Sequence, residues 1–301
     1  MEHMKLIDVK KCPICGLNKS SLFLEAADYS TSKESFSIRE CDSCRFRFTS
    51  PIPTEDKIGE YYQSEDYISH TDSSKGLMNK VYRLVRKRAI KKKEGLARNG
   101  TREKSLIDIG CGTGDFLNYC KGNGWSVLGL EPDEGARQIC KEKGVETQHT
   151  DFLYQIPDAS FEVITMWHVL EHVYHLNKDF HEIARVLKPD GKLIIAVPNC
   201  ASYDAKKYGK FWAAYDLPIH LYHFRPGDLM RFAAKHAFKV DQILPMKYDS
   251  YYVSMLSEKY KNGNLFNAFV SGFLSNRKAS KVNNEYSSQI YVLSKNTDEA
   301  G

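Results

Sequence analysis

Residues 106–114 read Leu-Ile-Asp-Ile-Gly-Cys-Gly-Thr-Gly, and this short stretch decides the fold. An apolar run of strand type ends at Asp108, and residues 115–120 after the stretch have helical spacing. Between them three glycines stand at alternate positions: Gly110, Gly112 and Gly114. A strand, a glycine loop and a helix in this order let a nucleotide-like ligand lie against bare backbone, because side chains there would collide with it.

The segments after the glycine loop continue as alternating strands and helices. Residues 125–130 form a strand-like run that leads to Glu131. An acidic residue about 20 positions past the first glycine can accept both ribose hydroxyls of a nucleoside. Residues 145–150 lead into Asp151 and Phe152. Further strands are predicted within 161–166, 186–198, 239–244 and 289–294.

The spacing of the glycines separates two kinds of nucleotide site. The dinucleotide fingerprint G-x-G-x-x-G needs a small residue at position 115, where this chain has Asp115. The observed G-x-G-x-G resembles motif I of the class I S-adenosylmethionine-dependent methyltransferases, and the resemblance covers residues 105–200 with four ordered motifs. It implies an α/β, Rossmann-like sheet of seven strands, the seventh antiparallel. The alternative is a different α/β nucleotide binder.

The same resemblance implies S-adenosylmethionine as the cofactor and assigns its contacts. The three loop glycines would face the methionine part, with Asp108 at the end of the strand before them. Glu131 would bind the ribose and Asp151 the adenine amino group, while Phe152 packs on the adenine ring.

Four of the eight cysteines stand in two C-x-x-C pairs near the N-terminus. They are Cys12, Cys15, Cys41 and Cys44. Four thiolates on two tight turns suit a tetrahedral, structural zinc ion. Disulfides or a redox pair are the alternatives. Neither is favoured, because the N-terminus has no apolar signal segment and a cytoplasmic location is expected.

The motifs divide the chain into three regions. We expect a zinc ribbon at 1–50, a helical linker or lid at 51–104, and a methyltransferase domain at 105–301 whose segment 201–260 binds the substrate. No apolar run approaches the roughly 20 residues that span a bilayer, so no membrane span is expected.

The linker carries a tyrosine-rich string and a basic segment. Tyr62 and Tyr67 are expected to fold over the cofactor as a lid, the alternative being that they pack the linker onto the core. Residues 80–104 hold eleven Lys or Arg against two Glu. This segment is either a nucleic-acid footprint or the solvated face of an amphipathic helix, and we favour the solvated face.

Two histidine clusters are candidates for the chemistry. Methyl transfer to a hydroxyl or carbon needs a group that removes a proton, and histidine does so near neutral pH. His168 and His172 follow the fourth predicted strand, at the edge where ligands bind in open α/β sheets. His220 and His223 belong to a later aromatic-rich segment. The alternative is that some of these histidines have structural roles.

The first cluster also permits a metal site. His168, Glu171 and His172 follow H-x-x-E-H, which on a helix would turn three ligands to one face. This string is similar to the Glu-x-x-Glu-His string of methyltransferases that need a divalent cation for vicinal hydroxyls. We expect a histidine base here, with a second divalent metal as the alternative.

The whole layout resembles zinc-ribbon-bearing bacterial methyltransferases, whose relatives include enzymes that methylate nucleotide-linked sugars. The shared string is Asp-x-Pro-x-His-x-x-His-Phe, which ends at Phe224. One departure is Ile219, where the family pattern has an arginine. The resemblance implies a small-molecule acceptor, a sugar or glycan precursor, with an RNA-modifying methyltransferase as the alternative. The sequence leaves the oligomeric state open.

Overall fold

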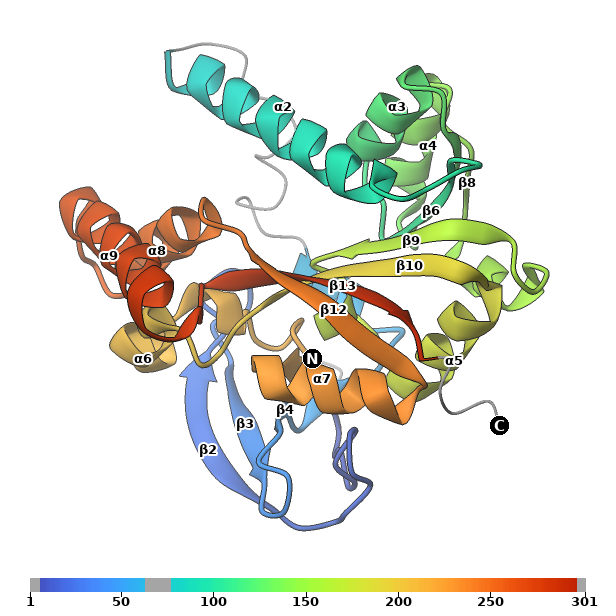
Figure 1. Cartoon of the computed structure of the whole chain (residues 1–301). Coiled ribbons are helices and arrows are strands. Elements are labelled where there is room, and N and C mark those ends of the chain that lie inside the picture. Colours follow the sequence, from blue (N-terminus) through green and yellow to red (C-terminus); the bar gives the residue numbers. More distant parts are fainter. Residues whose placement is uncertain (1–5, 63–76, 297–301) are drawn as a thin grey trace.

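A computed structural model describes residues 6–62 and 77–296, with the side chains of the first long helix from residue 86 onward. Its centre is a seven-stranded sheet (Figure 1). In spatial order the strands are β12 (Phe238–Pro245), β13 (Ser288–Lys295), β10 (Leu187–Pro198), β9 (Phe161–Trp167), β6 (Ser105–Ile109), β7 (Ser126–Leu130) and β8 (Thr147–Gln148). Strands β10 to β8 are parallel, whereas β13 is antiparallel to both neighbours. The predicted sheet, with its antiparallel last strand, is confirmed.

Helices cover both faces of the sheet because successive strand residues point to opposite sides. Leu106 and Ile194 pack in one buried cluster with residues of α2, α3 and α4, and Ile107 and Ile195 pack in another with residues of α5 and α7. The bounds are α2 (Leu77–Arg98), α3 (Asp115–Gly122), α4 (Glu134–Glu142), α5 (Leu176–Val186) and α7 (Pro226–Lys235). Short helices η2 (Thr150–Gln155) and η3 (Leu170–His172) follow β8 and β9.

The N-terminal region forms a smaller sheet that includes a strand from the C-terminal half. Its order is β11 (Tyr222–His223), β4 (Arg47–Thr49), β3 (Ser35–Cys41) and β2 (Ser20–Ala27). The remaining elements here are the pair β1 (Leu6–Ile7) with β5 (Ile52–Pro53), and η1 (Ile58–Tyr62). Because β11 pairs with β4, the predicted ribbon and the predicted substrate-binding segment share one sheet. Residues of both also lie in the same buried cluster as the central sheet.

Segments after β10 and β12 form a helical layer at one end of the central sheet, on the left in Figure 1. After β10 come α6 (Tyr203–Tyr208), η4 (Gly209–Phe211) and η5 (Ala213–Tyr215). Between β12 and β13 come α8 (Asp249–Tyr260), α9 (Leu265–Lys278) and η6 (Ala279–Asn283). The sequence pattern predicts no element for residues 262–286, most of which form α9 and η6. Within the described residues, no helix combines the length and the apolar character needed to cross a lipid bilayer.

Candidate active site

The glycine loop between β6 and α3 turns through three left-handed positions. The φ angle is 69° at Gly110, 54° at Gly112 and 73° at Gly114. A Cβ at Gly110 would lie 2.4 Å from Cγ2 of Val169, and one at Gly114 would lie 2.7 Å from Sγ of Cys140. At Gly112 the same construction meets no atom within 4 Å among the described residues. The loop is therefore closely packed at its ends and open at Gly112, where a ligand can approach the backbone.

Glu131 lies directly beside this open position. Its Oε2 accepts a hydrogen bond from the Gly112 N–H at 2.8 Å, and its Oε1 accepts one from the Asp133 N–H at 3.1 Å. Burial raises the pKa of this carboxyl, although the two N–H donors oppose the shift. The carboxylate thus supports the glycine loop from the end of the neighbouring strand, where the sequence predicted a ribose contact.

The other predicted cofactor residues differ in exposure. Asp108 is buried, its Oδ1 accepts from the Thr165 hydroxyl at 2.5 Å, and burial raises its pKa to about 7. Asp151 is exposed, with a carboxylate oxygen 3.1 Å from Nδ1 of His149. Phe152 is partly buried against the core cluster. Asp108 therefore lies inside the protein beneath the loop, whereas Asp151 lies at the rim.

Two residues near this loop were not predicted from the sequence. Trp167 ends β9, and its buried Nε1–H has no hydrogen-bond partner in the described part of the chain. The Lys93 ammonium lies 4.3 Å from the centre of the Trp167 ring, and burial lowers its pKa. Lys93 belongs to the basic helix α2. One basic side chain of this helix therefore faces the protein interior, although the amphipathic pattern indicated that its basic residues face solvent.

These features fit S-adenosylmethionine as a ligand of the glycine loop. The open backbone at Gly112 leaves space for it, the Glu131 carboxylate can accept hydroxyl donors, and the unpaired Trp167 N–H is a buried donor that lacks an acceptor. An unpartnered buried polar atom of this kind is typical of a functional site.

The chain turns sharply after β9, which corrects one prediction. His168 has a φ of 58°, and the helical turn that follows contains only Leu170–His172. The H-x-x-E-H string is therefore not on one helix, and its three side chains do not point to one face. His168 turns toward α8, where its Nε2 lies 3.1 Å from Oδ2 of Asp249, and its Nδ1 lies 3.4 Å from Oε1 of Glu171.

The two carboxylates make His168 a cation at neutral pH. Burial alone would lower the pKa of His168, but the contacts with Asp249 and Glu171 raise it to about 10. A protonated imidazole has no lone pair with which to accept a proton. We therefore do not assign His168 as the base. Asp249 lies 81 positions further along the chain, and no motif in the sequence connects the two residues.

His172 has one ring nitrogen, Nε2, that makes no hydrogen bond with the described residues. Its Nδ1 lies 2.9 Å from the carbonyl oxygen of Ile219 and 3.0 Å from the hydroxyl of Tyr62. A carbonyl oxygen only accepts, so Nδ1 carries the proton and Nε2 keeps its lone pair. Burial lowers the pKa of His172, which keeps the ring neutral at pH 7. Tyr62 thus reaches the site, whereas Tyr67 lies outside the described residues.

The His220 ring packs against the His172 ring in the candidate active site, whereas His223 lies elsewhere. The His172 and His220 rings are 4.6 Å apart in an edge-to-face arrangement, and Nδ1 of His220 donates to the carbonyl of Ala214 at 3.0 Å. Burial lowers the pKa of His220 well below its usual value. The Asp216 carboxylate, whose pKa burial raises to about 7, lies 4.0 Å from Nε2 of His220.

His223 is a structural residue at the joint between β11 and β4. Thr49 donates its hydroxyl to the His220 carbonyl at 2.6 Å, so its oxygen accepts from Nε2 of His223 at 3.1 Å. Burial lowers the pKa of His223 to about 3. Because Nε2 donates to the threonine, we do not assign His223 as the base.

Glu171 belongs to a group of side chains that could hold a metal ion at this site. It is completely buried, and neither carboxylate oxygen accepts a hydrogen bond from the described residues. Glu171, His172 and His220 each offer a ligand atom within 4.8 Å of the others, a group that could hold a metal ion. The predicted ligand His168 is replaced in this group by His220, which comes from a different segment.

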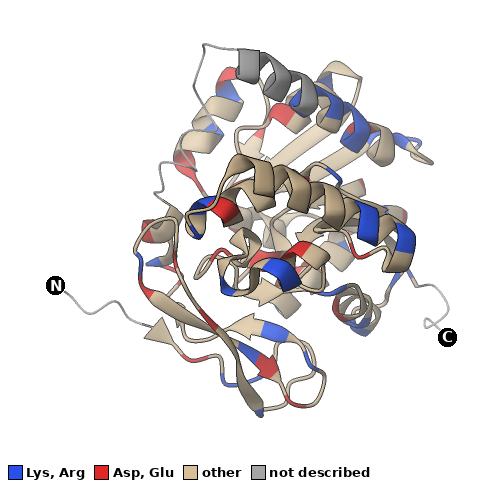
Figure 2. Ribbon diagram, turned by 90° about the vertical axis from the view of Figure 1, so that its left-hand side faces the viewer, with Lys and Arg blue, Asp and Glu red and all other residues tan. Residues whose placement is uncertain are grey.

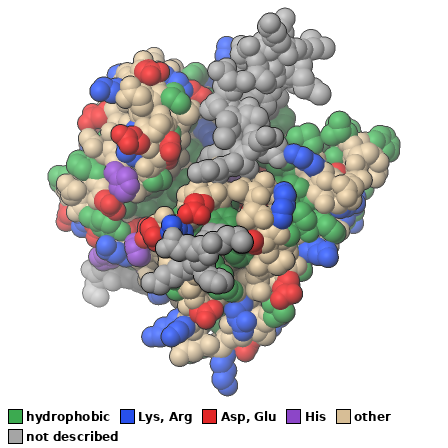
Figure 3. All heavy atoms as spheres, turned by 180° about the vertical axis from the view of Figure 1, so that it is seen from behind, with side chains coloured by type: hydrophobic (Ala, Val, Ile, Leu, Met, Phe, Trp, Pro, Cys, Tyr) green, Lys and Arg blue, Asp and Glu red, His purple; other side chains and the backbone are tan. Residues whose placement is uncertain are grey.

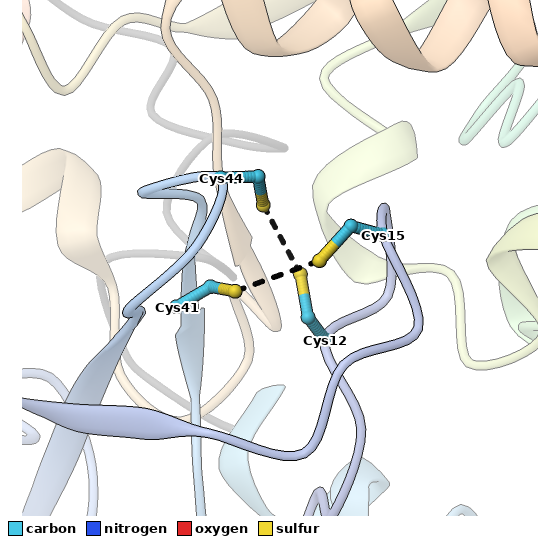
Figure 4. Close-up of side chains that lie close together, drawn as sticks. All are labelled: Cys12, Cys15, Cys41 and Cys44. Carbon is cyan, nitrogen blue, oxygen red and sulfur yellow. Dashed lines mark hydrogen bonds between the residues drawn. The ribbon is translucent and has the colours of Figure 1, made fainter.

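The four N-terminal cysteines form a second group that could hold a metal (Figure 4). Sγ of Cys12 lies 3.5 Å from Sγ of Cys44, and Sγ of Cys15 lies 3.6 Å from Sγ of Cys41. A disulfide needs about 2.05 Å, whereas ligands at about 2.3 Å from a tetrahedral zinc lie about 3.8 Å apart. The observed separations fit zinc ligands. Burial opposes ionisation of Cys41, but backbone donors of the turn lower its pKa to about 7.

Comparison with known proteins agrees with this geometry. A family model described as "Methyltransferase domain" matches residues 78–243, more than half of the chain. The chain therefore belongs to this family, the class I S-adenosylmethionine-dependent methyltransferases.

Two curated relatives are similar to this chain in sequence, and one solved structure shares its fold. The ubiquinone biosynthesis O-methyltransferase of Glaesserella parasuis is 27% identical over 165 residues, 48% of this chain and 70% of that protein. The protein of the same name from Nitrosococcus oceani is 27% identical over 174 residues, 53% of this chain and 72% of its own length. A candidate sarcosine dimethylglycine methyltransferase from Galdieria sulphuraria shares the fold, with a TM-score of 0.51, 14% identity and coverage of 71% and 86% of the two chains.

The contact between Glu131 and the glycine loop predicts an effect on cofactor binding. We expect Glu131→Ala to weaken S-adenosylmethionine binding by about 1–3 kcal/mol, the usual cost of a lost hydrogen bond to a charged group. Isothermal titration calorimetry measures this directly. Glu134→Ala, at the exposed start of α4, is the control and should bind like the parent protein. Unchanged affinity in Glu131→Ala would remove the ribose assignment.

The His168–Asp249 pair predicts a pH-dependent contribution to stability. Because the folded protein raises the pKa of His168 from about 6.5 to about 10, its stabilisation is complete below about pH 6.5 and is lost as pH rises through about 10. We expect Asp249→Asn to lower the free energy of unfolding by about 1–3 kcal/mol at about pH 6 and by much less above about pH 10. Urea unfolding at both pH values tests this, and an equal loss at both would contradict the assignment.

Proposed function

We propose that the protein methylates a hydroxyl or an acidic carbon of a small metabolite, a sugar or glycan precursor, with His172 as the general base. The observation that supports this most strongly is the neutral His172 ring, whose Nδ1 is tied to the Ile219 carbonyl while Nε2 remains free to accept a proton. Methyl transfer needs such an acceptor when the substrate atom carries a proton.

Each residue of the candidate active site would have a separate role in this reaction. S-adenosylmethionine, when bound, supplies a methyl group activated on a sulfonium, and Gly112, Glu131 and Trp167 are the residues that would hold it, with Asp108 beneath the loop. Nε2 of His172 takes the proton of the acceptor, so that the acceptor atom can bond to the methyl carbon. His220 packs edge-on against His172 and fixes the orientation of its ring. Alignment of this kind is the main contribution that a protein makes to a displacement reaction.

A transfer assay with a labelled methyl group tests the acceptor class. Purified protein is incubated with methyl-labelled S-adenosylmethionine and either a panel of nucleotide-linked sugars or bulk RNA. We expect the label in the small-molecule fraction, identified by mass spectrometry. Label in RNA, with none in the small molecules, would contradict the proposal.

The RNA alternative has less support from the basic helix α2. Arg86 is paired with Asp115, Arg98 with Glu94, and Lys93 lies over the Trp167 ring. Each of these three cations already has a partner within the protein. The exposed basic side chains that remain are those expected of a solvated helix face.

A divalent metal is the second candidate mechanism, and it is favoured by the buried Glu171 carboxylate, whose oxygens accept no hydrogen bond from the described residues. A cation held by Glu171, His172 and His220 would lower the pKa of an acceptor hydroxyl bound to it. The two matched curated relatives are named as O-methyltransferases. A chelator separates the mechanisms. A metal mechanism requires that EDTA abolishes turnover and that Mg²⁺ or Mn²⁺ restores it without zinc, whereas with His172 as the base Mg²⁺ and Mn²⁺ have no effect on turnover.

We also propose that Cys12, Cys15, Cys41 and Cys44 hold one structural zinc ion. All four possible ligands are protein thiolates, and a closed site of this kind has no position for a substrate. The Cys12 and Cys41 side chains lie in the same buried cluster as Phe224. The zinc would therefore stabilise the joint between the ribbon and the segment that carries His220.

A further inference from the structure

Helix α9 has its large apolar side chains on the outside. Leu265, Phe266, Phe269 and Phe273 are 67%, 75%, 64% and 48% exposed, and Val282 just beyond the helix is 79% exposed. At 100° per residue the four helical side chains fall within an arc of about 100°. We call these five residues the α9 outer face. Seen from behind in Figure 3, apolar side chains gather at the right-hand edge, where α8 and α9 lie.

The inner side of α9 consists of small residues. Those that are buried are Ala268, Ser271, Gly272 and Ser275. They allow a close approach to α8, since a Cβ at Gly272 would lie 2.7 Å from the Tyr251 ring. A helix that packs only against its own protein normally places its largest apolar side chains inward. This reversal indicates a second apolar environment on the outer side.

Basic residues predominate in the segment that carries the α9 outer face. Between residues 250 and 284 the sequence contains one carboxylate, Glu258, and that side chain is buried and paired with Lys261. Arg277, Lys278 and Lys281 follow the aromatic residues near the C-terminal end of α9. Figure 2 looks onto this side of the molecule, where the helices at the front are uncharged along most of their length and basic toward an end.

We propose that the α9 outer face binds the surface of an anionic lipid membrane. An apolar, aromatic helix face bordered by Lys and Arg is the composition of helices that lie in the membrane interface. Anionic headgroups attract the basic residues while the apolar side chains enter the acyl boundary. A second copy of the chain fits less well, because its residues 250–284 offer no exposed carboxylate that could pair with Arg277, Lys278 and Lys281.

This surface is connected to the candidate active site. Helix α8, which packs against α9, begins at Asp249, the partner of His168. Membrane binding through α9 would therefore hold the catalytic edge of the sheet near the lipid surface. Membrane binding by the α9 outer face does not depend on which acceptor the enzyme methylates.

Vesicle co-sedimentation of the whole 301-residue chain tests the proposal. We expect binding to vesicles of phosphatidylcholine with phosphatidylglycerol, weaker binding in high salt, and little binding to phosphatidylcholine alone. Phe266→Ser and Phe269→Ser should each lower the partition coefficient by about tenfold, since each removes a large apolar side chain from the interface. Arg277→Gln and Lys278→Gln should each lower it by about fivefold.

Met230→Ser is the matched control, since Met230 is 49% exposed on α7, outside the α9 outer face. It should bind like the parent protein. An unchanged melting temperature shows that each variant is folded. If a phenylalanine variant does not fold, the two charge variants still test whether the α9 outer face binds the membrane. Two results would overturn the proposal: no binding to anionic vesicles, or a dimer in light scattering that Phe266→Ser converts to a monomer.

Discussion

His172→Asn is expected to lower turnover by about 10²–10⁴-fold while S-adenosylmethionine binds with its usual affinity. Asparagine keeps a polar group near Ile219 but supplies no nitrogen that accepts a proton. The effect belongs to the chemical step, because the hydrogen bonds of His172 go to the Ile219 carbonyl and the Tyr62 hydroxyl and not to Glu131 or the glycine loop. Single-turnover kinetics with saturating cofactor, together with calorimetry, separate the two quantities.

The pH profile of the parent enzyme provides an independent check on the same residue. Burial lowers the pKa of His172, so kcat/KM should rise with pH and level off with a midpoint below about 6.5. His175→Asn serves as the control, since this exposed histidine pairs with Glu55 away from the site. A His172→Asn enzyme with full turnover would exclude the base assignment.

Cys41→Ser is expected to remove zinc and to unfold the ribbon. The fourth thiolate is needed for a closed tetrahedral site, and structural zinc contributes on the order of 10 kcal/mol in domains that depend on it. Because Cys41 lies in the main buried cluster, the loss should extend to β11 and lower the melting temperature of the whole protein. Elemental analysis should find one zinc per chain in the parent protein and none in the variant.

Cys120→Ala is the matched control for this experiment. Cys120 is equally buried but lies on α3, remote in sequence from the two C-x-x-C pairs. It should keep its zinc and lose only the roughly 1–2 kcal/mol of a small core truncation. Zinc retained by Cys41→Ser, or absent from the parent protein, would refute the metal assignment.

Local patterns in the sequence were sufficient for the central sheet and for the two cysteine pairs. Strand runs such as 106–109 are short and apolar, and the glycine spacing after them permits few structures. The C-x-x-C pairs are equally local, because each pair needs only one tight turn. These features involve residues close in the sequence, so their spacing carries most of the information.

Contacts between distant segments could not be predicted in this way. The sequence does not reveal that Asp249 pairs with His168, or that the Ile219 carbonyl fixes the ring of His172. The strained turn at His168 also breaks the helical spacing on which the H-x-x-E-H interpretation depends. Each of these details is set by packing between separate elements, and together they decide which histidine can act as the base.

The outward-facing aromatic residues of α9 could not be predicted from the sequence, for a different reason. A periodic apolar pattern predicts that one side of a helix is buried, and it does not say what buries it. On α9 the small residues face the protein, so the usual assignment of large residues to the core is reversed.

The central claim is that the cofactor lies on the glycine loop with its reactive end toward His172 and His220. A crystal structure with bound S-adenosylhomocysteine tests it most directly. We predict the ribose on Glu131, the sulfur directed toward Nε2 of His172, and space for one acceptor molecule between them. A sulfur directed away from the two histidines, or separated from them by protein atoms, would contradict the account.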